Sequence, residues 1–249
     1  MATLNLNADL GESWYDRRVG NDTELMPLLD SCNIACGFHG GDALTMQRTI
    51  ELALRHNVAI GAHPSFPDRK NFGRQRMELP LAQLKAMLLY QVSALQGMVR
   101  ASGAELHHIK PHGALYHYLN EYPLGAEALV EVALALGVPR VYGPPEGALR
   151  GAVAGAMDDT KQGAGLVFWA EGFADRAYEP DLKLRSRSLP GATIDDPKAA
   201  AEQVRLLAME QVVVATDGKR YPLAVDTVCI HGDHAGALSR ARAVRAVLG

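Results

Sequence analysis

Four histidines of this chain each follow a short run of apolar or β-branched residues. They are His39, His63, His112 and His231, which follow the runs 32–38, 58–62, 106–111 and 225–230. A neutral imidazole near physiological pH can accept a proton or bind a metal ion. One histidine at the end of a strand is often a structural group, but four of them favour an active site at the carboxyl ends of the strands of an α/β barrel.

Acidic and basic side chains occupy the same kind of position. Asp9 follows the run 4–8, and Lys110 lies two residues before a histidine. A carboxylate can take a proton or orient a water molecule, and a buried lysine can polarise a carbonyl group or stabilise an oxyanion. The structural alternatives are a turn, a helix cap or a lysine paired with a carboxylate. The predicted catalytic residues are Asp9, Glu12, His39, Lys110, His112 and Asp233.

Other polar residues near these positions could bind a substrate. The segment 63–76 is long, aromatic and basic, and its arginines could hold a carboxylate or a phosphate. It could equally be a solvated loop or a contact surface for a partner protein. A second acidic and basic segment, 171–176, follows a predicted strand. The predicted substrate-binding residues are His63, Arg74, Glu171, Asp175, Arg176 and His231.

A divalent ion is the cofactor that such residues would accept. A Zn²⁺ or Mn²⁺ site needs about three nitrogen or oxygen ligands and an open position, and Mg²⁺ is a further alternative. No short spacing such as HxxxH supports the assignment, so purely structural histidines remain open. The ligands we consider are Asp9, His39, His63 and His231.

Short strands alternate with helical patterns along the whole chain. The predicted strands cover 4–8, 32–36, 58–62, 106–110, 140–142, 165–170 and 227–230, and the predicted helices lie within 42–57, 80–103, 124–136, 198–211 and 235–248. This order predicts a parallel sheet. With 249 residues, it predicts a seven-stranded, TIM-like (β/α) barrel formed by one domain, 1–249. The run 212–215 is either an eighth strand or the first arm of a hairpin closed near 217–218.

Composition and charge limit the partners and the cellular compartment that we expect for the protein. The net charge of −3 and the pI near 6.3 give no electrostatic case for nucleic acid or a membrane surface as partner. Cys32 and Cys36 would lie about 13 Å apart on one extended strand, too far for a disulfide bond. We therefore expect reduced thiols in a cytoplasmic protein, with neither a signal peptide nor a membrane span. The oligomeric state stays open, and a homo-oligomer is one alternative.

Several common catalytic motifs are missing. The chain contains no GxxxxGK[ST], no GxGxxG after a strand and no GxSxG. An ordinary P-loop and a hydrolase nucleophile elbow are therefore not expected.

Seven segments together resemble the LamB/YcsF family. They are NLNADLGE at 5–12, NIACGFHGGD at 33–42, GAHPSFPD at 61–68, FGR at 72–74, KPHGALY at 110–116, FADR at 173–176 and CIHGD at 229–233. The resemblance runs over nearly the whole chain. The chain departs from the family pattern at Asn5, at Ala8, after Glu12 and at 234–235.

The resemblance implies a seven-stranded barrel related to the glycoside hydrolase and deacetylase barrels. It also implies the role of the A subunit of an ATP-dependent 5-oxoprolinase, which converts 5-oxo-L-proline, ATP and water into L-glutamate, ADP and phosphate. ATP would be the co-substrate, and 5-oxoprolinase subunits B and C would be the partners.

Two alternatives from other classes remain open. One is a stand-alone metal-dependent amidohydrolase or carbohydrate deacetylase, which would need no ATP. The other is a non-catalytic subunit that binds substrate or holds a complex together. The apolar helices do not decide between them, because the helix layer of a barrel and the interface of a complex look alike in sequence.

Overall fold

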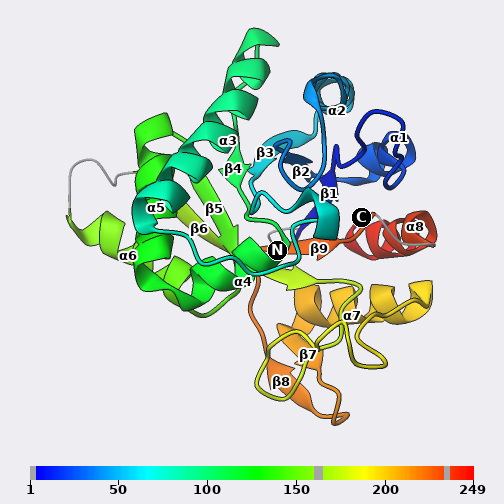
Figure 1. Ribbon diagram of the computed structural model, residues 1–249. Coiled ribbons are helices and arrows are strands. Elements are labelled where there is room, and N and C mark those ends of the chain that lie inside the picture. The colour runs from blue at the N-terminus through cyan, green and yellow to red at the C-terminus, as the bar shows by residue number, and fades with distance from the viewer. Residues whose placement is uncertain (1–3, 160–164, 233–235) are drawn as a thin grey trace.

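Seven parallel strands close into a barrel in the computed structural model, which describes residues 4–159, 165–232 and 236–249 (Figure 1). Their order around the barrel is β1-β2-β3-β4-β5-β6-β9, so each strand pairs with its neighbour in sequence until β9 closes the ring between β6 and β1. The strands are β1 (Asn5–Leu10), β2 (Ser31–Ala35), β3 (Ala59–His63), β4 (His108–Ile109), β5 (Arg140–Gly143), β6 (Val167–Phe173) and β9 (Thr227–Ile230). The predicted seven-stranded barrel is confirmed.

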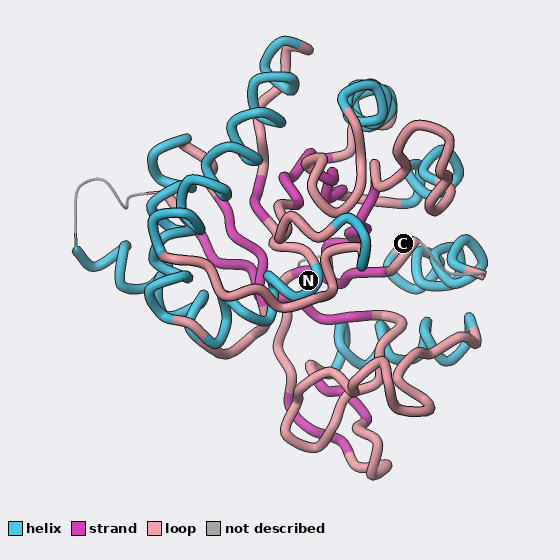
Figure 2. Tube along the Cα trace, viewed as in Figure 1, coloured by secondary structure: helices cyan, strands magenta, loops and turns pink. Residues whose placement is uncertain are grey.

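Helices surround the strands, as the tube in Figure 2 shows. They are α1 (Asp22–Leu25), α2 (Ala43–Arg55), α3 (Leu81–Ala101), α4 (Gly113–Glu121), α5 (Pro123–Leu136), α6 (Ala148–Asp159), α7 (Pro197–Glu210) and α8 (Ala237–Leu248), with the 3₁₀ turns Met26–Leu28 and Arg69–Asn71. The Asp42 carboxylate caps α2 by accepting from the Thr45 N–H at 2.9 Å. Among the helices of the described ranges, none combines the length and the apolar character that a membrane crossing requires.

The structure differs from the sequence prediction at several element bounds. β6 continues to Phe173, so Glu171 lies within a strand and not after it, and Asp9 likewise lies within β1. The run 212–215 contributes to a hairpin outside the barrel, made of β7 (Val212–Val214) and β8 (Arg220–Pro222). The helices α1, α4 and α6 have no counterpart in the sequence prediction. The expectation of buried thiols without a disulfide bond is confirmed for Cys32, Cys36 and Cys229.

The interior of the barrel is unusually polar. Barrels of this type are commonly filled by branched apolar side chains, whereas here Asn33 donates to Asn7 Oδ1 at 2.7 Å and to Asp9 Oδ1 at 2.8 Å. Its remaining amide oxygen lies 2.6 Å from His108 Nε2, which must therefore be the donor. The His108 ring in turn stacks on Tyr142 with 3.9 Å between centroids. This network fills the space below the carboxyl ends of the strands and fixes the Asp9 carboxylate.

Gly61 on β3 makes room for that network. A Cβ atom at this position would lie 2.1 Å from His108 Nε2, well inside van der Waals contact. The ring cannot withdraw, because it is fully buried and hydrogen-bonded to Asn33.

We expect Gly61→Ala to lower the free energy of unfolding by about 3 kcal/mol or more, because the added methyl group displaces a buried, stacked ring. Gly97→Ala is the matched control. It lies within α3, a Cβ there meets nothing within 4 Å, and the exchange should raise stability by roughly 0.5–1 kcal/mol. Urea denaturation of both variants measures the difference, and equal midpoints for Gly61→Ala and wild type would contradict the packing argument.

Candidate active site at the carboxyl ends of the strands

A cavity of about 370 Å³ opens at the end of the barrel where the predicted site residues gather. This is the end at which the active sites of TIM-like barrels lie. Its lining includes seven of the predicted residues, namely Asp9, His63, Arg74, Lys110, His112, Arg176 and His231. Within the described ranges the lining does not include Glu12, His39, Glu171 or Asp175, which contact the lining residues or one another from behind. Asp233 lies outside the described residues.

Lys110 is a buried cation that contacts several other groups of the site. Its Nζ lies 2.9 Å from Asp9 Oδ1, 2.9 Å from Glu171 Oε1 and 3.0 Å from Cys229 Sγ. Burial alone would lower the pKa of Lys110, but Asp9, Cys229 and Glu171 raise it well above its usual range. Lys110 therefore remains an ammonium ion, paired with carboxylates and lining the cavity on one side.

Asp9 is held in its ionised form. Burial by itself would raise the pKa of Asp9, but His63 and Lys110 hold it well below its usual range. Its Oδ1 accepts hydrogen bonds from Lys110 and Asn33, and its Oδ2 lies 3.2 Å from His63 Nε2. An ionised carboxylate that lines the cavity and lies beside an imidazole is suited to orient water or accept a proton.

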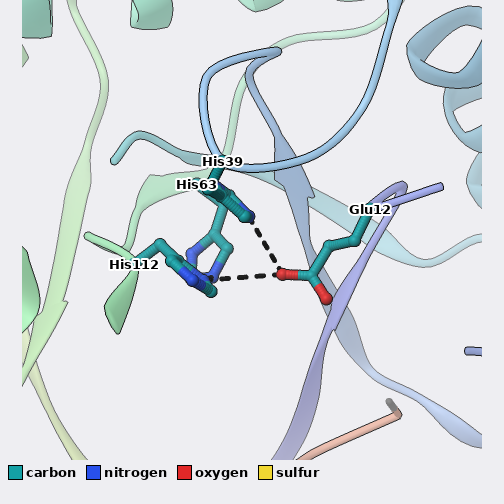
Figure 3. Close-up of side chains that lie close together, drawn as sticks. All are labelled: Glu12, His39, His63 and His112. Carbon is teal, nitrogen blue, oxygen red and sulfur yellow. Dashed lines mark hydrogen bonds and ion pairs between the residues drawn. The ribbon is translucent and has the colours of Figure 1, made fainter. Parts of the chain in front are cut away.

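Three imidazoles and one carboxylate meet in one place (Figure 3), and one of the imidazoles, His63, contacts Asp9. The ligand atoms of Glu12, His39, His63 and His112 all lie within 4.8 Å of one another, and all four residues are buried. The rings of His39 and His112 stack in parallel with 3.6 Å between centroids. Burial lowers the pKa of both rings well below the ordinary value, so both are neutral. This buried cluster could bind a metal ion.

The segment 63–76 supports this cluster. The Phe72 carbonyl oxygen lies 2.8 Å from His112 Nε2, and the Phe72 ring contacts the His39 and His112 rings edge to face. Gly73 follows with φ of +67°, and a Cβ on it would lie 2.8 Å from the His112 ring. Arg69, from the same segment, donates to two backbone carbonyl oxygens on either side of His39. The segment is therefore part of the site and not merely a solvated loop.

The predicted substrate-binding residues that follow β6, Asp175 and Arg176, make different contacts. Asp175 accepts from the His231 N–H at 3.0 Å and lies 2.9 Å from His231 Nδ1, so it orients that imidazole. Arg176 lines the cavity and also donates to the carbonyl oxygens of Ala192 and Arg185, which fixes the segment after it. Burial and the nearby Arg187 lower the pKa of Arg176 to about 10.

Some residues of the site are absent from the sequence prediction. Asn33, His108 and Cys229 contact Asp9 or Lys110 directly or through one residue. The sequence does hold a signal for Asn7, a further missed residue, since Asn5, Asn7 and Asp9 alternate with apolar residues and therefore share one face of β1. No such signal marks Cys229.

Comparisons with known proteins agree over the full length of the chain. The model of the LamB/YcsF family matches residues 4–249. A protein named as the A subunit of 5-oxoprolinase from Tolumonas auensis is 42% identical over 248 residues, which cover 100% of this chain and 96% of that protein. The protein of the same name from Methylococcus capsulatus is 43% identical over 243 residues, covering 98% and 91%. The crystal structure of a lactam utilization protein from Thermus thermophilus has a TM-score of 0.89 and 39% identity, covering 99% and 96% of the two chains.

Replacing Lys110 should destabilise the fold in a pH-dependent way. Lys110→Met leaves Asp9 and Glu171 buried without their cation, and we expect a loss of about 3–5 kcal/mol at pH 8. In the wild type the pKa of Asp9 is lower in the folded protein than in the unfolded chain, so Asp9 stabilises the fold at a pH above its unfolded pKa. This contribution is lost only as the pH falls through the low pKa of the folded state. In the variant the buried carboxylates instead favour protonation, so the difference from wild type should shrink toward pH 5.

Lys85→Met is the matched control, because Lys85 pairs with Glu131 on the surface with both side chains about half exposed. It should cost less than about 1 kcal/mol at either pH. Urea denaturation at pH 8 and pH 5 measures both variants. The assignment fails if Lys110→Met and Lys85→Met behave alike.

Proposed function

The chain belongs to the LamB/YcsF family, and we propose that it acts as the A subunit of an ATP-dependent 5-oxoprolinase. In this proposal it cleaves the lactam of 5-oxo-L-proline to L-glutamate while ATP is hydrolysed, as one barrel domain working with partner subunits B and C. The observation that carries the proposal is the cavity in which ionised Asp9 lies against Lys110 and His63, in a chain whose full-length relatives are named for this activity.

The chemistry of a lactam explains the need for ATP. A five-membered lactam is a stable amide, and phosphorylation of its oxygen would make it a far better target for water. The sequence contains no P-loop, so ATP as co-substrate would bind at an unusual site or at an interface within the complex. Cytoplasmic residence is part of the proposal, because the three cysteines are unpaired thiols.

The residues of the cavity have distinct roles in this proposal. Asp9 Oδ2 would take a proton from the attacking water, and the charge of Lys110 would stabilise the negative charge on the phosphorylated lactam oxygen as its bond to carbon breaks and phosphate leaves. His112 is less suited to stabilise negative charge, since its Nε2 proton is donated to the Phe72 carbonyl oxygen. Arg74 and Arg176 line the cavity and would hold the substrate carboxylate.

The remaining predicted residues support these groups. His63 and His231 line the cavity, while Glu171 and Asp175 position Lys110 and His231 from behind. A divalent ion, Mg²⁺, Mn²⁺ or Zn²⁺, is also part of the proposal, because the cluster of Glu12 and three histidines offers ligand atoms for one.

That same cluster favours a second candidate function. A stand-alone metal-dependent amidohydrolase or carbohydrate deacetylase would also place buried histidines and a carboxylate beside a cavity. It would hydrolyse an amide without ATP or partners and would lose activity to a chelator.

Glutamate release from 5-oxoproline distinguishes the two. We expect release only when this chain, its partner subunits and ATP are all present. Within that complex Asp9→Asn should lower the rate by about 10²–10⁴-fold, because it removes the base without changing the shape of the side chain. His112→Ala should also lower it strongly. His56→Ala, at the exposed end of α2, is the control and should leave the rate unchanged.

Two results would overturn the proposal. Full activity of both Asp9→Asn and His112→Ala in the assembled complex would move the chemistry away from this cavity and favour a non-catalytic role. Chelator-sensitive hydrolysis of another amide by this chain alone, without ATP, would favour the second candidate.

A further inference from the structure

The hydrogen bonds behind two histidines fix which ring nitrogen carries the proton. His63 Nδ1 lies 2.7 Å from the Lys110 carbonyl oxygen, and His112 Nε2 lies 2.8 Å from the Phe72 carbonyl oxygen. A carbonyl oxygen only accepts, so the proton must be on the nitrogen that faces it. Where a ring carries no second proton, its other nitrogen has a lone pair, which is Nε2 in His63 and Nδ1 in His112.

These two lone pairs point at each other. His63 Nε2 and His112 Nδ1 are 2.9 Å apart, the distance of a hydrogen bond, yet in two neutral rings neither atom would have a proton to donate. The nearest charged atoms are acceptors too, since Asp9 Oδ2 lies 3.2 Å from His63 Nε2 and Glu12 Oε1 lies 3.5 Å from His112 Nδ1. Two imidazole nitrogens and two carboxylate oxygens thus converge on one place, and a cation between them would be attracted by all four.

We propose that His63 Nε2, His112 Nδ1 and the Glu12 carboxylate bind a divalent transition-metal ion such as Zn²⁺. Two ligands that each lie 2.0–2.1 Å from a zinc ion are about 3.3–3.4 Å apart in a tetrahedral site, and the separations of 2.9 and 3.5 Å bracket this value. Histidines that bind metals almost always donate their other N–H to a carbonyl or carboxylate, as both of these do. This inference rests on the divalent ion of the proposed function, to which it assigns three ligand atoms and a narrower choice of metal from the side-chain geometry.

The proposed ion has an open side toward the cavity. His63, His112 and Asp9 line the cavity, whereas Glu12 approaches from behind. Three protein ligands and one open position are the arrangement of catalytic zinc sites. Asp9 Oδ2 would lie beside the open position.

His39 has a different role from the other two histidines. Its Nε2 lies 3.0 Å from Glu12 Oε1, but its Nδ1 is buried and has no hydrogen-bond partner. If Nε2 bound the metal, Nδ1 would need to carry an unsatisfied buried proton, which is costly. His39 therefore donates its Nε2 proton to Glu12 and acts as a positioning residue (Figure 3).

The donor atoms select the kind of ion. Two imidazole nitrogens and one carboxylate suit Zn²⁺, Mn²⁺ or Fe²⁺, whereas Mg²⁺ prefers oxygen ligands and keeps its water. His231, which the sequence suggested as a ligand, is instead oriented by Asp175 and is not among the four residues of the cluster.

Direct metal binding tests the assignment without any assay of activity. Protein treated with a chelator is titrated with Zn²⁺ by calorimetry, and the visible absorption of Co²⁺ reports the coordination. We expect one ion per chain in the wild type and a Tm that rises by several degrees with Zn²⁺. Millimolar Mg²⁺ should give no comparable shift.

Variants separate ligands from supporting residues. His63→Gln, His112→Gln and Glu12→Gln should each weaken Zn²⁺ binding by more than about 100-fold, and His39→Gln, which keeps an N–H donor for Glu12, by about 10–100-fold at most. His231→Gln and the exposed His56→Gln should bind as the wild type does. Circular dichroism shows whether each variant is folded. Where a variant does not fold, the Co²⁺ absorption of the wild type tests the proposal instead, because it reports the coordination of the bound ion.

The proposal is wrong if the stripped wild type binds no Zn²⁺, Mn²⁺ or Co²⁺ below millimolar concentration, since the lone pairs would then share a proton. It is also wrong if folded His112→Gln binds Zn²⁺ like the wild type, or if Mg²⁺ binds equally well. None of these outcomes depends on glutamate release, so failure of the metal site and failure of the proposed reaction can be told apart.

Discussion

One buried ammonium group connects the strands at the active end of the barrel. Lys110 follows β4, and its Nζ contacts Asp9 on β1, Glu171 on β6 and Cys229 on β9. Removing three charged groups from water is expensive, and their mutual attraction offsets that cost only when the geometry is good and the remaining polar atoms are bonded. The buried ammonium group of Lys110 therefore requires β1, β6 and β9, which are distant in sequence, to place their polar side chains around it.

The polar interior of the barrel follows from this constraint. Each charged oxygen needs further donors, and Asn7 and Asn33 supply them from β1 and β2. Asn33 needs a donor of its own, which is His108, and the His108 ring requires Gly61 to lack a side chain. An apolar filling would pack as well but would leave the buried carboxylates unsatisfied. The arrangement holds the Asp9 carboxylate in a fixed orientation before any substrate binds, which is what electrostatic preorganisation requires.

The sequence predicted the barrel, and which residues gather at one end of it, better than the contacts among those residues. Histidines at the ends of successive strands must meet if the strands are parallel and neighbouring, so His39, His63 and His112 could be grouped from their positions alone. The partners of these histidines could not be identified in this way. Glu12 and His112 are separated by a hundred residues, and which imidazole nitrogen faces which carbonyl depends on side-chain packing. The sequence places Glu171 after its strand, whereas β6 runs on to Phe173, a bound that local residue preferences do not define.

The charges of the cavity are divided in a way that would orient a small anion. Asp9 lies at the barrel end with Lys110 and the histidines, whereas Arg74, Arg176 and Arg185 line the same cavity from other segments. Burial and the nearby Arg187 depress the pKa of Arg176, and an anion beside it would relieve that repulsion. A molecule with one carboxylate, such as the lactam of the proposed reaction, would direct this group toward the arginines because Asp9 repels it. Its amide would then lie beside Asp9 and Lys110, where a water molecule can be deprotonated and an oxyanion stabilised.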